Sequence, residues 1–167
     1  MSHAVAQTSR QTPFAVDMEV TSASGRRQAL GCWLRKYADR ADRQLFVGTD
    51  SRQTNGSTKF TSVVVSYAPG HGGTYASHNY QTRRIEALGE RLHLEAWNSI
   101  ELGLLVSAAV PGSEITVHLD VNCNDRFRSS AWASGLMGMV MAQGFGVEVK
   151  PRAFTASSLA DALVREY

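Results

Sequence analysis

The chain has 167 residues, of which 43% are hydrophobic and 19% charged, and its formal net charge is +2 at pH 7. This length and apolar content predict one globular domain, and the mild positive charge permits a polyanionic partner without requiring one. Cys32 and Cys123 have no CxxC or CxxH spacing, which argues against a zinc site or a disulfide framework. No apolar run approaches the roughly 18 residues of a spanning helix, and the start lacks signal-peptide order, so we expect a cytoplasmic protein.

The N-terminal part predicts an arm followed by a helix. Residues 1–25 are rich in Ser, Thr, Ala and Gln, and we expect a flexible arm there, with a single domain over 26–167. The stretch after Gly25 places Leu30, Trp33, Leu34 and Tyr37 at helical spacing, with Arg and Lys on the opposite side. This pattern predicts an amphipathic helix that precedes the sheet.

Three strand candidates come next, QLFVGTD at 44–50, KFTSVVVSYA at 59–68 and TYASHNYQT at 74–82, and they predict an antiparallel meander. A helix over about 86–108, a strand over 115–121, a helix over 129–143, a strand from 146 and a terminal helix in 156–167 follow. The predicted order is βββαβαβα. Because a helical crossover returns to the same sheet as a parallel strand, 115–121 should lie beside 44–50.

Four acids occupy positions where a carboxylate is costly, next to or inside apolar elements: Asp50, Glu95, Asp120 and Asp161. If the strands of Asp50 and Asp120 are parallel neighbours, both aspartates lie at carboxyl ends, on strands about 4.8 Å apart. Glu95, from the covering helix, and Asp161, from the last helix, can complete a site for two Mg²⁺ or Mn²⁺ ions. Each acid alone has an ordinary alternative, since strand-end aspartates form turns, Glu95 can pair with a base, and Asp161 can complement a helix dipole.

Several other residues are candidates around these acids. Four residues are candidate contacts to a nucleic-acid backbone: Ser51, Lys150, Arg126 and Arg128. The three cations among them would position that backbone by charge without reading its sequence. His118 lies two residues before Asp120 and should share its sheet face, so we expect either a partner that orients this acid or a core histidine. No base partner is evident for Cys123, which argues against a nucleophilic cysteine.

The element order and five segments resemble the ribonuclease H-like fold, and more narrowly the YkuK-like family of bacterial and phage proteins. The segments are VGTDS at 47–51, RLHLEAWNS at 91–99, HLDVN at 118–122, SGLMGMVMAQGFGVEVKP at 134–151 and ASSLAD at 156–161. The resemblance implies an α/β fold with a five-stranded mixed sheet, in the order third, second, first, fourth, fifth, flanked by helices, with an extra N-terminal helix. It also identifies Asp50, Glu95, Asp120 and Asp161 as the metal-binding acids of ribonuclease H enzymes.

The expected function is therefore a nuclease that uses Mg²⁺ or Mn²⁺ to hydrolyse RNA, an RNA/DNA hybrid or structured DNA by a two-metal mechanism. One feature departs from the family's pattern, because the segment RAFTAS before the last helix lacks the catalytic histidine of many ribonuclease H enzymes. A module of this fold that binds nucleic acid or protein without catalysis is the alternative. A kinase-like ATP site is disfavoured, because VGTDS lacks a glycine after the aspartate.

Overall fold

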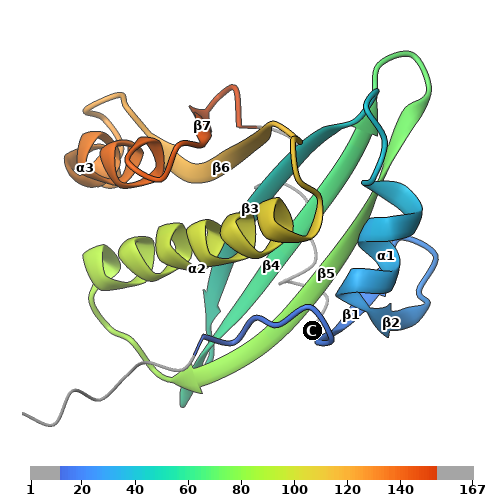
Figure 1. Cartoon of the computed structure of the whole chain (residues 1–167). Helices are drawn as coiled ribbons and strands as arrows, with labels where there is room; N and C mark the ends of the chain where they lie inside the picture. Colours follow the sequence, from blue (N-terminus) through green and yellow to red (C-terminus); the bar gives the residue numbers. More distant parts are fainter. Residues whose placement is uncertain (1–11, 154–167) are drawn as a thin grey trace, which may run out of the picture.

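The computed structural model describes residues 12–153, which form one seven-stranded mixed sheet and three helices (Figure 1). Along the chain the elements are β1 (Glu19–Ser22), β2 (Arg27–Ala29), α1 (Leu30–Tyr37), β3 (Gln44–Gln53), β4 (Ser57–Ala68), β5 (Gly72–Arg83), α2 (Leu88–Ala109), β6 (Ile115–Asn122), α3 (Ser130–Met141) and β7 (Gly146–Lys150). The strand order across the sheet is β2-β1-β5-β4-β3-β6-β7.

The predicted meander is confirmed in β3, β4 and β5, which pair antiparallel over most of their lengths. Gly70 in the β4–β5 turn and Gly72 at the start of β5 have φ angles of 77° and 80°, in the left-handed region that glycine enters without a Cβ penalty. After the α2 crossover, β6 pairs parallel with β3, and β7 pairs parallel with β6. These five strands therefore have the predicted order.

The predicted count of five strands is wrong, because the sheet also contains β1 and β2. Both precede α1, and β1 pairs with β5 through Thr21 and Ser77, which extends the sheet beyond the meander. The stretch 12–25, for which we predicted a flexible arm, thus contains a strand, and Phe14 within it is buried in the core. Because Arg27–Ala29 is extended, α1 begins only at Leu30 and is shorter than predicted.

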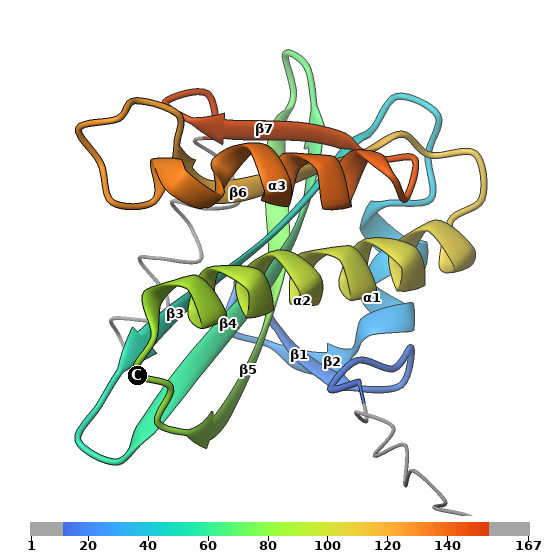
Figure 2. The ribbon, with the colours of Figure 1, turned by 90° about the vertical axis from the view of Figure 1, so that its left-hand side faces the viewer.

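The three described helices cover one face of the sheet (Figure 2). A single hydrophobic core joins Trp33 and Leu34 of α1, Ile100 of α2 and Leu136 of α3 to the inward side chains of the central strands. The first turn of α2 lies against α3, since a Cβ at Gly89 would be 2.7 Å from Nε1 of Trp132. No helix in the described part of the chain is long and apolar enough to cross a membrane.

The face of each strand residue follows from the alternation along β3 and β6. Val47 in β3 and Val117 in β6 point into the core beneath α2. Phe46 belongs instead to a small cluster with Val63 and Val65 on the opposite face, and its ring centroid lies 4.9 Å from that of His118. Even-numbered residues of β3 and β6 therefore lie on the face away from the described helices.

Candidate functional site

Asp50 and Asp120 occupy equivalent positions on the neighbouring parallel strands β3 and β6. The last residues paired between these strands are Gly48 and His118, so each aspartate lies two residues beyond the end of the ladder. Both are even-numbered and share the face away from the described helices. Asp50 is only 9% exposed, and it pairs with Thr61 across the β3–β4 ladder. The expected proximity of these acids is thus built into the register of the sheet.

Glu95 approaches these strands from the second turn of α2, where it is 6% exposed. Its pKa is raised from 4.5 to about 8, mainly because burial penalises the carboxylate and next because Asp50 is negative, with a smaller contribution from Asp120. Ser51 Oγ donates a hydrogen bond to Glu95 Oε1, and Arg91 Nη1 donates to Ser51 Oγ at 3.2 Å. Three acids from β3, α2 and β6 therefore share one electrostatic neighbourhood.

Lys150, the last residue of β7, forms an ion pair with Asp120 through Nζ and Oδ1. A register irregularity between β6 and β7 separates the pairs Leu119–Val149 and Asn122–Lys150, which bracket the aspartate. The lysine side chain is 46% exposed and that of Asp120 is 18% exposed. A cation that we considered as a phosphate contact therefore lies against one of the candidate metal ligands.

The remaining predicted site residues lie at different depths. Ser51 is partly buried between α2 and β3, where its hydroxyl contacts Glu95 rather than open solvent. Arg126 and Arg128 are exposed in the loop that follows β6. His118 is 1% exposed, and its Nε2 lies 3.3 Å from Glu148 Oε2 of β7. Burial lowers the pKa of His118, and the neighbouring glutamate partly opposes that effect.

The donor chemistry of this cluster fits a divalent cation. Carboxylate oxygens are the ligands that Mg²⁺ and Mn²⁺ prefer, and burial together with the negative charges of Asp50 and Asp120 raises the pKa of Glu95. However, within residues 12–153 no three His, Cys, Asp or Glu side chains come close enough together to hold an ion. The fourth predicted ligand, Asp161, lies outside the described residues.

Two contacts of this site were not predicted from the sequence. Arg91 supports the Ser51–Glu95 pair, and its position one turn before Glu95 on the same helix was the available signal. Glu148 pairs with His118 across the β6–β7 ladder, and no local pattern indicates that pairing before the strand register is known. Both contacts join residues on different elements around the acids.

A comparison with protein-family models identifies the family of this chain. The family model described as ribonuclease H-like matches residues 34–165, which is more than half of the chain. Among solved structures, the chain is similar to the N-terminal RNase H domain of rv2228c from Mycobacterium tuberculosis, solved as a fusion with maltose binding protein. The identity is 16%, the match covers 74% of this chain and 97% of that chain, and the TM-score is 0.33. No curated protein matches the chain. On the family match, the chain belongs to the ribonuclease H-like family.

Proposed function

We propose that this protein is a nuclease that requires a divalent metal and hydrolyses phosphodiester bonds of RNA, an RNA/DNA hybrid or structured DNA. The observation that carries the proposal is the matching position of Asp50 and Asp120 beyond the paired ends of β3 and β6, near enough to the buried Glu95 of α2 for both charges to raise its pKa. Burying an acid beside two others is unfavourable unless the site gains something from it, and perturbed acids cluster at functional sites. Membership of the ribonuclease H-like family supports the same class of chemistry.

Asp50, Glu95, Asp120 and Asp161 would hold Mg²⁺ or Mn²⁺. When bound, such ions supply an activated water and stabilise the leaving oxygen of a phosphodiester. Ser51 and Arg91 fix the position of one Glu95 oxygen before any ligand arrives. Substrate phosphate oxygens are common ligands of Mg²⁺, and they would complete a set that the described acids leave incomplete.

The basic residues around the acids would position the substrate. Lys150 neutralises Asp120 in the free protein, and its half-exposed side chain can turn toward a phosphate when a metal ion replaces it at the carboxylate. Arg126 and Arg128 lie in the loop that directly follows the strand of Asp120. Such contacts fix the backbone by charge and carry no sequence information. The natural partner is therefore proposed to be a nucleic acid. His118 would support the strand that carries Asp120.

Replacement of Asp50 by Asn tests the proposal, because it removes a charge and keeps the shape of the side chain. The wild type should cleave at least one substrate in a panel of RNA, DNA and hybrid oligonucleotides with Mg²⁺ or Mn²⁺, and the Asp50→Asn and Asp120→Asn proteins should not. Asp125→Asn is the matched control, since this aspartate is exposed in the loop after β6. Full activity of the Asp50→Asn protein would refute the metal-site assignment.

The alternative is a module of the same fold that binds nucleic acid or protein without cleaving it. The ion pair between Lys150 and Asp120 favours this alternative, because a lysine satisfies a carboxylate that catalysis would need for a metal ion. The absence of a histidine from RAFTAS points in the same direction. Binding of an oligonucleotide by the Asp50→Asn protein without metal, together with no cleavage by the wild type on any substrate, would establish this alternative.

A further inference from the structure

Phe127 is an exposed aromatic residue between two arginines in the loop that joins β6 to α3. It is 52% exposed, whereas most large apolar side chains of the described chain are buried in the core. Arg126 and Arg128 on either side are exposed as well. Asp125 lowers the net positive charge of this segment without removing it. The loop therefore presents an aromatic ring and two guanidinium groups to solvent.

Local hydrogen bonds hold this loop in one conformation. The side-chain oxygen of Asn122 accepts from the backbone N–H of Asn124 at 2.9 Å, and that of Asn124 accepts from the N–H of Arg126 at 3.0 Å. The N–H of Phe127 donates to the carbonyl of Asn124, and its own carbonyl accepts from Ser130 at the start of α3. A loop fixed in this way loses little conformational entropy when a ligand binds.

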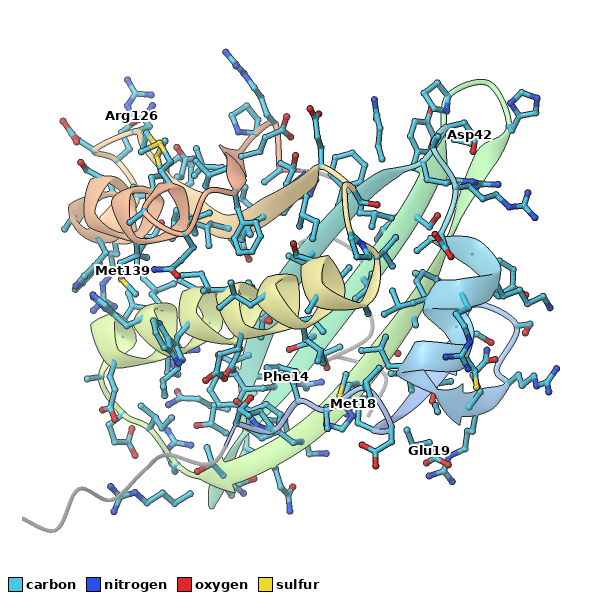
Figure 3. All side chains as sticks on the ribbon, in the orientation of Figure 1. Phe14, Met18, Glu19, Asp42, Arg126 and Met139 are labelled. Carbon is cyan, nitrogen blue, oxygen red and sulfur yellow. The ribbon has the colours of Figure 1, made fainter. Side chains whose placement is uncertain are left out.

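The loop lies at the same end of the sheet as the candidate acids. Asp120 is two residues before the end of β6, and the loop begins directly after that strand. In Figure 1 the end of β6, the start of α3 and the first turns of α2, which carry Glu95, occupy the same side of the molecule. Figure 3 shows Arg126 at the outer edge of the loop, with its side chain directed away from the sheet.

We propose that Phe127 stacks on an unpaired base of a single-stranded nucleic acid whose backbone passes Arg126 and Arg128. The proposal rests on the nuclease function proposed above and names its substrate class. Stacking on an aromatic ring needs a free base face, which a paired and stacked duplex does not offer within its length. The flanking arginines match the phosphates on either side of such a base. A hydrophobic protein partner would meet these two charges at the centre of its contact, which is unfavourable.

Binding without cleavage separates this proposal from the nuclease activity. The experiment measures fluorescence anisotropy of labelled 12-nucleotide single-stranded RNA and DNA, and of a blunt duplex of the same sequence, in EDTA. Loss of one stacked base corresponds to about 1–3 kcal/mol, so Phe127→Ala should weaken single-strand binding roughly 5- to 150-fold. Duplex binding should change less than twofold. Phe127→Trp, which keeps a stacking surface, should bind single strands at least as well as the wild type.

Tyr67→Ala is the matched control, since Tyr67 is a 37% exposed aromatic residue at the other end of the β3–β4 ladder, opposite Gln44. It should bind as the wild type does. Unchanged single-strand binding by Phe127→Ala overturns the proposal, as does an equal loss on single strands and duplex, or a wild type that binds no oligonucleotide. Single-strand binding that depends on Phe127 in a protein without cleavage activity would refute only the nuclease proposal.

Discussion

Glu95 should make the protein less stable as the pH rises, and Glu95→Gln should remove that effect. The folded protein raises the pKa of this acid from 4.5 to about 8, so between these values the folded state binds a proton that the unfolded state has released. The stabilisation is complete below pH 4.5 and is lost as the pH rises toward 8. At about 1.4 kcal/mol per pH unit, the loss is about 3 kcal/mol at pH 7 and about 5 kcal/mol at pH 8.5.

Urea unfolding in EDTA at pH 5, 7 and 8.5 measures this loss directly. Glu95→Gln keeps the shape of the side chain and cannot ionise, so its free energy of unfolding should exceed that of the wild type by a margin that widens with pH. Glu90→Gln, an exposed change in the first turn of the same helix, should give a small difference that is constant with pH. A constant difference for the Glu95 variant, or a less stable variant at pH 8.5, would refute the assignment of a buried protonated acid.

Three further predictions concern His118, Lys150 and the core. Burial lowers the pKa of His118, so the unfolded chain takes up a proton before the folded protein does as the pH falls below 6.5. In urea unfolding, the free energy of unfolding of the wild type relative to that of His118→Asn should therefore be smaller at pH 5 than at pH 7.5. A larger value at pH 5 would contradict the prediction. Lys150→Met removes the cation that is paired with Asp120. The affinity for Mn²⁺, measured by calorimetry, should therefore rise about fivefold, the equivalent of about 1 kcal/mol. Weaker Mn²⁺ binding by this variant would contradict a role of Asp120 as a ligand. Leu34→Ala, at a residue 1% exposed in the core, should cost about 2–5 kcal/mol in urea unfolding, and a cost below 1 kcal/mol would place it outside the core.

The parts of the fold that the sequence predicts are those with long, regular patterns. KFTSVVVSYA and ITVHLDV each carry enough β-branched residues to predict a strand. Because a helical crossover precedes ITVHLDV, this strand is predicted to pair parallel with QLFVGTD. The segments EVTS and RQA are four and three residues long and mostly polar, and their strand conformation depends on pairing with β5 and with each other. No local pattern distinguishes them from an irregular arm, so the extension of the sheet is decided by tertiary contacts.

The candidate site also has one part that the sequence predicts and another that depends on tertiary contacts. The neighbouring positions of Asp50 and Asp120 follow from strand adjacency, which the element order predicts. The contact of Lys150 with Asp120 depends on the irregularity between β6 and β7, and the contact of Ser51 with Glu95 depends on the position of α2 over β3. Such details require the register and the docking of elements, which residue spacing alone does not supply.

The different environments of the acids predict how a metal ion would bind. Asp120 has its charge balanced by Lys150, whereas Glu95, with a pKa of about 8, is largely protonated at pH 7. An ion that uses Glu95 as a ligand must displace this proton, because a coordinating carboxylate is ionised. Mn²⁺ titrations at pH 7 in two buffers of different ionisation enthalpy should therefore show release of about one proton per ion in the wild type.

The same titrations with Glu95→Gln separate this origin of the proton from others. The variant has no proton at that position to release, so any binding that remains should be independent of the buffer. Asp125→Asn, the exposed loop change, should release protons as the wild type does. Equal proton release in the wild type and Glu95→Gln would mean that the buried glutamate is not a ligand. The ion would then depend on Asp50 and Asp120 at the end of the β3–β6 ladder, where Lys150 competes with it for one of the two carboxylates.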